Sequence, residues 1–192
     1  MNYIENDSYE EYKDNQIRTN KGKLQYVWIT DNEIVKLVKY IKKNNITIHK
    51  GVCHGARNGY EVSNFRELLD ADIIGTDISD TATQFPNMVQ WDMHDRNIEW
   101  VDYFDFIYSN SIDHSYDFNL CLSSWMESLT KDGICCIQWS GEISNPFNKT
   151  DCFGIEKQEL INLINEQYAV TDIIEVAGRG PGTIVLIIQH KK

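Results

Sequence analysis

The hydrophobic residues of this chain alternate between short continuous runs and longer segments with helical spacing. Short runs rich in β-branched residues are typical of buried strands. Five such runs follow one another: "ITIHKGVC", "ADIIGTD", "MVQWD", "YFDFIYSN" and "ICCIQWS". Several of the segments between them, such as "YEVSNFRELLD", space their apolar residues three or four positions apart, as one face of a helix does. Strands that alternate with helices predict a parallel sheet with helices on both faces.

The last two predicted strands have no helix between them. They are "AVTDIIEVAG" and "GTIVLIIQHKK", and the turn residues "RGPG" join them. So short a connection joins only antiparallel neighbours, because a parallel pair needs a crossover of about a dozen residues or more. The sequence therefore predicts an α/β fold of three layers. Its seven-stranded sheet is mostly parallel, with one reversed strand made by the C-terminal hairpin.

The first thirty residues differ from the rest because they are polar and show little periodicity. We expect residues 1–30 to form an N-terminal extension that could serve as a lid. Thr30 and Glu33 then form a capping-box pattern, which predicts that a helix starts there. The full length of 192 residues fits one domain, so residues 31–192 are predicted to fold as a unit. A later helix, "FNLCLSSWMESLTKDG", is predicted to end at Gly133.

Composition narrows the class of protein and its partners. The formal net charge is -11, and no stripe of Lys and Arg is present, so binding to nucleic acid is disfavoured. The acidic balance favours a small molecule or a protein as partner. No apolar run approaches the roughly 18 residues of a membrane span, and the first residues lack the apolar region of a signal peptide. We therefore expect a cytoplasmic protein without a membrane partner.

The five cysteines give no sign of a disulfide framework or a zinc site. Their number is odd, and no pair has C-x-x-C spacing. Cys135 and Cys136 are adjacent within an apolar strand, so their side chains should point to opposite faces of the sheet. The sequence predicts buried structural thiols.

Polar residues gather where the predicted strands end. In open α/β sheets, ligands bind at the carboxyl ends of the strands, close to the point where the strand order reverses. The first strand is followed by "CHGARNG", whose Gly55 and Gly59 allow close approach of a ligand. Carboxylates follow the next three strands, as Asp77, Asp92 and Asp113. These strand ends therefore predict a ligand site.

The kind of ligand follows from which groups are present. An acid at the end of the second strand commonly holds ribose hydroxyls, which suits Asp77. Asp92 could accept a hydrogen bond from an adenine amine. The chain has neither a complete G-x-G-x-x-G nor a phosphate-binding G-x-x-x-x-G-K-[ST] motif. These features favour a nucleoside without a large phosphate load over NAD or ATP.

In this order and spacing, the motifs resemble those of class I S-adenosylmethionine-dependent methyltransferases, which have a Rossmann-like methyltransferase fold. The resemblance covers roughly residues 46–190 and rests on five segments. They are "CHGARNG", "IIGTDIS", "VQWDMHD", "FDFIYSNSIDHSYD" and "ESLTKDGICCIQWS". It implies S-adenosylmethionine as the cofactor, S-adenosylhomocysteine as its product, and a small molecule as the expected methyl acceptor.

The resemblance also implies which residues bind the cofactor. The glycine-rich loop corresponds to Cys53, His54, Gly55, Arg57 and Gly59. Asp77, followed by Ile78, is implied at the ribose, and Asp92 with Met93 at the adenine. Asn110 and Ser111 are implied at the methionine end.

Two residues of the loop depart from the family pattern. Cys53 stands where the family has an acid, and Arg57 stands at the position of its middle glycine. The interaction of that acid must then come from backbone carbonyls, from water or from another carboxylate. Arg57 fits only if its φ angle suits a side chain.

His114 is the candidate acid or base, because the unperturbed pKa of histidine lies near neutrality and its loop should face the acceptor. The alternative is a surface or hydrogen-bonded histidine. No metal is expected, since His54, His94 and His114 lie on different loops without paired ligand spacing.

Structural roles compete with each assignment. The glycines could form a simple turn, Asp77 could cap a helix, Asp92 could be a solvated loop acid, and Asn110 could cap a turn. The alternative function is a non-catalytic nucleoside-binding or interaction module on the same fold. An NAD-dependent reductase is a weaker third hypothesis.

Overall fold

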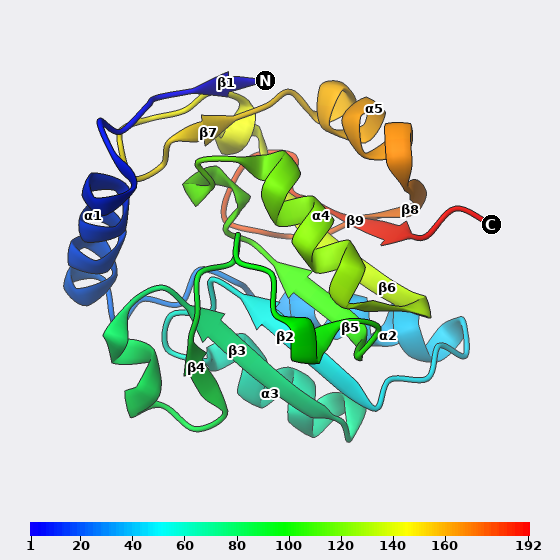
Figure 1. The fold of residues 1–192 in the computed structure, drawn as a ribbon. Coiled ribbons are helices and arrows are strands. Elements are labelled where there is room, and N and C mark those ends of the chain that lie inside the picture. The colour runs from blue at the N-terminus through cyan, green and yellow to red at the C-terminus, as the bar shows by residue number, and fades with distance from the viewer.

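The computed structural model describes all residues from 1 to 192 and is built around a seven-stranded sheet (Figure 1). The strand order is β4-β3-β2-β5-β6-β9-β8. The strands are β2 (Lys50–His54), β3 (Asp72–Asp77), β4 (Met88–Gln90), β5 (Phe104–Ser109), β6 (Leu129–Trp139), β8 (Ala169–Glu175) and β9 (Ile184–Gln189). Every neighbouring pair is parallel except those of β9, which is antiparallel to both β6 and β8. The predicted sheet, with its reversed hairpin strand, is confirmed.

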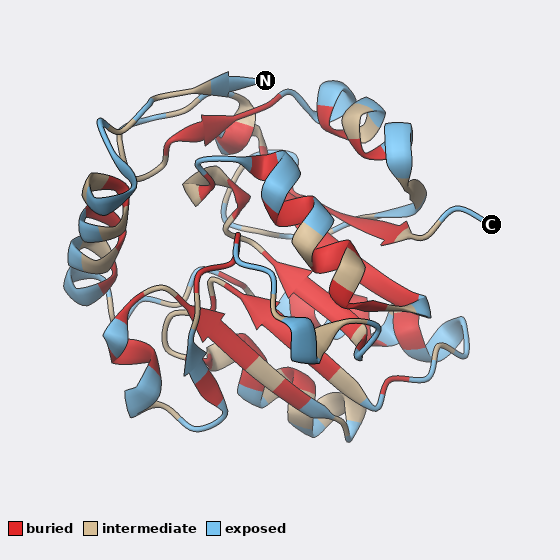
Figure 2. Cartoon of the chain, in the orientation of Figure 1, coloured by how far each residue is buried: buried red, intermediate tan, exposed pale blue.

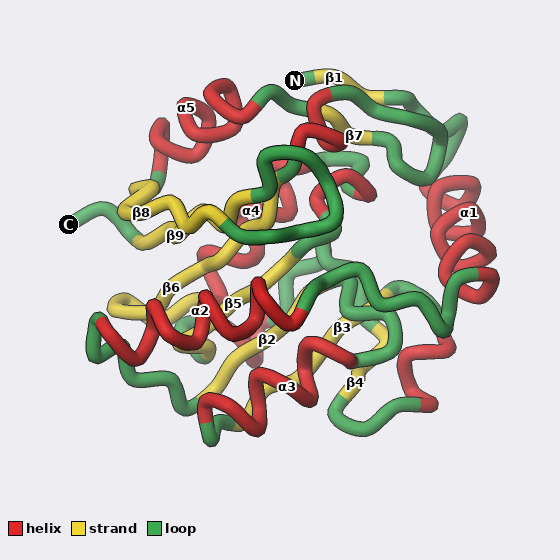
Figure 3. Tube along the Cα trace, turned by 180° about the vertical axis from the view of Figure 1, so that it is seen from behind, coloured by secondary structure: helices red, strands yellow, loops and turns green.

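Helices cover both faces of this sheet, as the alternating pattern predicts. Helices α2 (Asp31–Lys43) and α3 (Tyr60–Leu69) lie on one face (Figure 3), and α4 (Phe118–Ser128) and α5 (Lys157–Gln167) lie on the other (Figure 1). Each face has its own hydrophobic core, and the central strands are buried along most of their length (Figure 2). Cys135 belongs to one core and Cys136 to the other, which confirms that adjacent thiols point to opposite faces.

The sequence predicts one of two helix ends correctly. Helix α2 begins with the predicted capping box between Thr30 and Glu33. Helix α4, in contrast, ends at Ser128, and the prediction that it continues to Gly133 is wrong. The segment that follows enters β6 because Leu129 pairs with Phe104 of β5. Gly133 has a different role: a Cβ there would lie 2.9 Å from the backbone oxygen of Asp105, so only glycine allows the strands this close.

Helix α1 (Tyr9–Gly22) was not predicted, and it lies beyond the carboxyl ends of the strands instead of on a face of the sheet (Figure 1). Its buried residues are Tyr12, Asn15, Gln16 and Asn20, so its inner face is mostly polar and produces no apolar periodicity. Strand β1 (Asn2–Tyr3) precedes it and pairs with β7 (Phe153–Gly154), which ties the N-terminal segment to the loop after β6. None of the five helices has the length and apolar content needed to span a membrane.

Candidate functional site

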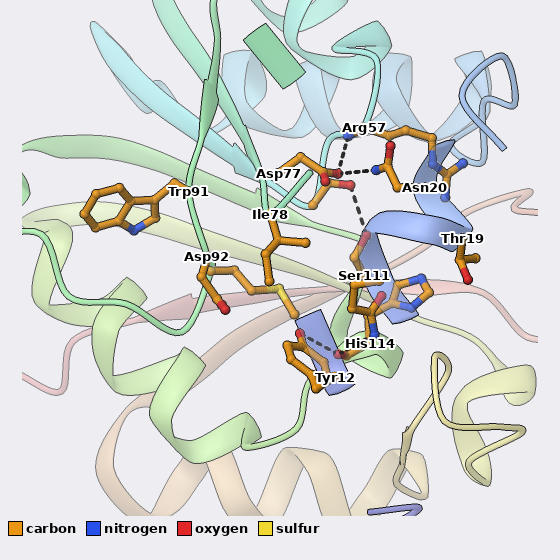
Figure 4. A pocket seen from close by; sticks show the side chains of 13 residues that line it. Tyr12, Thr19, Asn20, Arg57, Asp77, Ile78, Trp91, Asp92, Ser111 and His114 are labelled. Atoms are coloured by element: carbon orange, nitrogen blue, oxygen red, sulfur yellow. Dashed lines mark hydrogen bonds between the residues drawn. The ribbon is translucent and has the colours of Figure 1, made fainter. Parts of the chain in front are cut away.

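A small cavity of about 60 Å³ lies where the strand ends converge beneath α1 (Figure 4). The strand order places β2 between β3 and β5, so the sheet reverses direction at this point, which is where open α/β sheets bind ligands. The cavity brings together eight of the predicted site residues. They are Gly55, Arg57, Asp77, Ile78, Asp92, Met93, Ser111 and His114.

Asp77 ends β3 with its carboxylate buried and bonded on both oxygens. Oδ1 accepts from the backbone N–H of Ser79 at 2.9 Å, and Oδ2 accepts from the backbone N–H of Arg57 at 3.0 Å. Burial raises the pKa of Asp77, and these two hydrogen bonds and the charge of Arg57 oppose the shift. The helical turn that follows is capped by Ser79, whose side chain accepts from Thr81, so capping does not require Asp77.

Asp92 follows β4 and is held by a buried histidine. Its Oδ1 accepts from the backbone N–H of His94 at 2.9 Å and lies 2.6 Å from His94 Nδ1. Burial alone would raise the pKa of Asp92, but the hydrogen bonds and charge of His94 outweigh it and leave this pKa below its ordinary value. His94 Nε2 lies 2.9 Å from the buried hydroxyl of Ser115. This chain of contacts links the loop after β4 to the loop after β5.

Side chains of helix α1 already form hydrogen bonds with both carboxylates that are predicted to bind the cofactor. The side-chain amide of Asn20 donates to Asp77 Oδ2 at 2.8 Å (Figure 4). The hydroxyl of Tyr9 donates to Asp92 Oδ2 at 2.9 Å. Tyr12, Gln16 and Thr19 of the same helix also line the cavity. Its volume of about 60 Å³ is far below the roughly 300 Å³ at which small-molecule pockets begin, so it is too small for a nucleoside.

The sequence contains a signal for α1 that could have revealed this helix. Ser8 and Glu11 have capping-box spacing, and the Ser8 hydroxyl accepts from the backbone N–H of Glu11 at 3.1 Å. What the spacing does not reveal is that Tyr9 and Asn20 reach Asp92 and Asp77, because those contacts join residues far apart in the sequence.

A second, much larger cavity of about 730 Å³ lies beside the first and shares four of its residues. It extends from the loop after β2 to the segment between β6 and β7. Five predicted site residues line it, namely Gly55, Arg57, Asn110, Ser111 and His114. A space of this size falls in the usual range for small-molecule pockets.

The loop after β2 uses three left-handed backbone conformations in five residues. Gly55 has φ 71°, Arg57 has φ 43° and Gly59 has φ 72°. A Cβ at Gly55 would lie 2.6 Å from the Cβ of Ser111, so the glycine is required for the approach of the loop after β5. Arg57 therefore has a backbone conformation that favours glycine, at a steric cost that its side chain brings. Its Nη1 donates to the carbonyl of Tyr26 at 3.2 Å.

Three residues predicted to bind the cofactor have no side chain in either cavity. Cys53 is fully buried in the core beneath α2 and α3, and burial raises the pKa of its thiol. The ring of His54 stacks on Trp125 with centroids 5.0 Å apart, and burial lowers its pKa to about 3, so it is neutral. Gly59 caps α3 and packs against Met88. The thiol of Cys53 therefore does not stand in for a missing acid in either cavity.

Glu61 is a candidate site residue that the sequence predictions missed. It lies in the first turn of α3, lines the large cavity and is only 6% exposed. No Lys, Arg or His forms an ion pair with it. Burial raises the pKa of Glu61 to about 7, although its own backbone N–H and the charge of Arg57 oppose this. A signal existed, since acids are favoured in the first turn after a glycine-rich loop.

His114 lies at the border of the two cavities, among carboxylates. Its Nδ1 lies 3.1 Å from the carbonyl of Thr150 and 3.4 Å from Asp151 Oδ1. Because a carbonyl can only accept, Nδ1 carries the proton of the neutral ring and Nε2 is free to accept one. Neighbouring Asp113 has a buried oxygen, Oδ1, without a hydrogen-bond partner, and burial raises the pKa of this carboxyl.

Asp113, His114 and Asp151 also form a group of metal-ligand type, which the sequence reasoning did not expect. Each offers one ligand atom, and these atoms lie within 4.8 Å of one another. Nδ1 of His114 could bind a metal only after losing the proton that it donates to the Thr150 carbonyl. The arrangement therefore suits a positive charge near the carboxylates more readily than a metal bound through Nδ1.

Comparison with known proteins gives a fold but no sequence family. No family model matches the chain, and no curated protein matches it. Among solved structures, 1,6-didemethyltoxoflavin-N1-methyltransferase of Burkholderia thailandensis superimposes with a TM-score of 0.74 at 13% identity, covering 98% of this chain and 93% of that one. That enzyme was solved with 1,6-didemethyltoxoflavin and S-adenosylhomocysteine bound.

Two further structures show the same similarity. Geranyl diphosphate C-methyltransferase of Streptomyces coelicolor has a TM-score of 0.72 at 8% identity and covers 96% of this chain and 100% of its own. N-methyltransferase NodS of Bradyrhizobium japonicum has a TM-score of 0.65 at 9% identity, with 93% and 100% covered. Both were solved with S-adenosylhomocysteine. The chain therefore has the Rossmann-like methyltransferase fold that its motifs predict.

Proposed function

We propose that this protein is an S-adenosylmethionine-dependent methyltransferase that acts on a small molecule. The observation that carries the proposal is the pair of buried carboxylates Asp77 and Asp92, which end neighbouring strands at the switch point of a methyltransferase fold. Asp92 pairs with His94 through Oδ1 only, while its Oδ2 and the carboxylate of Asp77 have no cationic partner. A ribose diol and an adenine amine supply donors of the kind that these two carboxylates accept.

The remaining contacts follow from where the side chains lie. We assign Ile78 and Met93 to the faces of the adenine, and Asn110 and Ser111 to the methionine end of the cofactor. Gly55 and Arg57 would contribute backbone, while Cys53, His54 and Gly59 would act by holding the loop in place. This assignment is supported by the two cavities, which meet at Gly55, Arg57, Ser111 and His114.

Glu61 is proposed to bind the α-ammonium group of the cofactor. It supplies the carboxylate that Cys53 cannot, from the next helix instead of from the strand. The support is its position in the wall of the large cavity, its burial and its lack of a cationic partner. A cation that binds there would favour the ionised carboxylate and offset the cost of its burial.

Residues 1–30 are proposed to act as a lid. The hydrogen bonds of Tyr9 and Asn20 occupy the carboxylates that the cofactor would use, so α1 must withdraw these side chains before a nucleoside can enter. The same helix would then cover the bound nucleoside and exclude water. Residues 31–192 carry the remaining contacts and form the proposed catalytic domain.

The proposed reaction depends more on the alignment of the acceptor with the methyl group than on reactive side chains. The cofactor's sulfonium supplies an activated methyl group for in-line displacement. The chain has to position the acceptor beside Ser111 and His114, which is catalysis by proximity. His114 Nε2 can accept a proton from the acceptor, because Nδ1 is held by the Thr150 carbonyl.

Titration calorimetry with S-adenosylmethionine and S-adenosylhomocysteine tests the proposal. Both should bind, and Asp77→Ala should weaken binding by about tenfold or more, since hydrogen bonds to a charged group contribute about 1.5–3 kcal/mol. Asp72→Ala is the matched control, because Asp72 is exposed at the other end of β3. Absence of binding at millimolar concentrations, or equal affinity in Asp77→Ala, would contradict the proposal.

A non-catalytic binding module is the second candidate, and the hydrogen bonds of Tyr9 and Asn20 to the two carboxylates favour it. If α1 never leaves Asp77 and Asp92, the fold would serve as a scaffold. Absence of cofactor binding would support such an interaction scaffold, and cofactor binding without any methyl transfer would support a nucleoside-binding module. For either function we place the protein in the cytoplasm, where five buried, unpaired thiols would remain reduced.

A further inference from the structure

The large cavity, in which the methyl acceptor is proposed to bind, carries an excess of negative charge. Asp113, Glu142 and Asp151 line it, and none of them forms an ion pair with Lys or Arg. The cations of the same cavity are Lys23 and Arg57. Arg57 acts on Glu61, which also lines the cavity, and Lys23 acts on Asp113 without forming an ion pair with it, so four carboxylates face two cations.

The two carboxylates nearest His114 differ from ordinary surface acids. Asp113 and Asp151 are both partly buried, and Oδ1 of Asp113 is buried without a hydrogen-bond donor. Glu142 is exposed and contributes less, because solvent screens it. A buried carboxylate oxygen without a donor is costly, and a cation that enters the cavity would relieve that cost.

Aromatic side chains line the same cavity. Tyr26 is 68% exposed, Trp28 is 49% exposed and Phe147 is 82% exposed, although large aromatic side chains are usually buried. Tyr26 and Trp28 come from the segment between α1 and α2, while Phe147 precedes β7. Exposed aromatic rings beside carboxylates are the surroundings that favour a cation attached to a flat or apolar body.

We infer that the methyl acceptor is an amine that is positively charged at neutral pH and carries an aromatic or apolar body, and that the methyl group goes to its nitrogen. This inference rests on the proposed methyltransferase function and specifies its substrate class. The carboxylates at Asp113 and Asp151 hold the ammonium group, and the rings of Tyr26, Trp28 and Phe147 hold its body.

The proton balance of this reaction uses residues of the same cavity. The ammonium group first loses one proton to His114 Nε2. The freed lone pair then forms the new N–C bond as the S–C bond of the sulfonium breaks. The positive charge passes from sulfur to nitrogen, so the products are a methylated ammonium ion and a neutral thioether. His114 returns its proton to solvent, through the opening of the cavity.

Three probes with one body and different head groups test the inference: phenethylamine, phenethyl alcohol and phenylacetic acid. For binding, each probe is titrated into the protein saturated with S-adenosylhomocysteine. For activity, the protein is given S-adenosylmethionine and one probe, and the S-adenosylhomocysteine that forms is measured. The activity assay is run once with EDTA and once with Mg²⁺. The amine should bind at least about tenfold more tightly than the alcohol and the acid, and it should be methylated with EDTA present.

Two variants localise the effect. Asp151→Asn should raise the KM for the amine by about tenfold and leave the dissociation constant of S-adenosylhomocysteine unchanged. Asp132→Asn, at an exposed position of β6, should change neither value. Equal or stronger binding of the alcohol or the acid, or methyl transfer to phenethyl alcohol that requires Mg²⁺, would overturn the inference and leave the proposed function standing. Failure of the cofactor to bind would instead refute the proposed function.

Discussion

The burial of Glu61 predicts that this residue affects both the stability of the protein and its affinity for the cofactor. Glu61 is 6% exposed, and burial raises the pKa of its carboxyl from 4.5 to about 7. The folded protein therefore retains a proton that the unfolded chain releases above about pH 4.5. Folding becomes less favourable as the pH rises through this interval, and the loss is complete once the pH passes the folded pKa. The difference between 4.5 and about 7 corresponds to about 3 kcal/mol.

The variant Glu61→Gln removes the titrating group and keeps a side chain of nearly the same size. Between pH 5 and pH 8 the free energy of unfolding of the variant, relative to that of the natural chain, should increase by about 2–3 kcal/mol. For a chain of this length that difference corresponds to a melting temperature change of about 5–10 °C. Urea unfolding at the two pH values measures it. Glu67→Gln, on the exposed side of the same helix, is the control.

The Glu61→Gln variant should also bind the cofactor more weakly than the natural chain. If the ionised carboxylate of Glu61 binds the α-ammonium group, the affinity of the natural chain for S-adenosylhomocysteine should rise with pH through about 7, and that of Glu61→Gln should not. Calorimetry at pH 6 and pH 8 measures both. If the difference in the free energy of unfolding between Glu61→Gln and the natural chain does not change with pH, burial does not raise the pKa of Glu61. Equal affinities at pH 8 would refute the assignment of Glu61 to the cofactor.

Three further predictions concern α1, the glycine-rich loop and the sheet. Asn20→Ala removes a buried hydrogen bond to the carboxylate that ends β3, so calorimetry should show S-adenosylhomocysteine binding about tenfold more tightly, and weaker binding would contradict the lid. Arg57→Gly relieves a positive φ of 43° and should raise the free energy of unfolding in urea by about 1 kcal/mol. A loss instead would mean that the guanidinium contacts stabilise more than the strain costs. Gly75→Ala would place a Cβ 2.2 Å from Met88 Sδ, and it should lower that free energy by about 1–3 kcal/mol, whereas Gly22→Ala, with nothing within 4 Å, should not.

The layered fold was predictable because its signals are local. Each strand reads as a short apolar run, and the "RGPG" turn before β9 is too short for anything but an antiparallel return. The carboxylates Asp77 and Asp92 were predictable for the same reason, since an acid after an apolar run must lie at the edge of the sheet. Helix α4 shows the limit of such signals. The residues after Ser128 could have continued the helix, and pairing with β5 decided that they form a strand.

The sequence by itself determined the sheet, its two helical layers and the edge where a ligand would bind. Only the tertiary structure decided which side chains reach that edge. Cys53 lies in the glycine-rich segment, yet the face of β2 on which it lies turns its thiol into the core. Glu61 reaches the cavity because α3 begins beside it. Asn20 and Tyr9 cover the two carboxylates through contacts 57 and 83 residues apart. Periodicity reports which residues are buried, but a polar contact between distant segments exists only once the chain has folded.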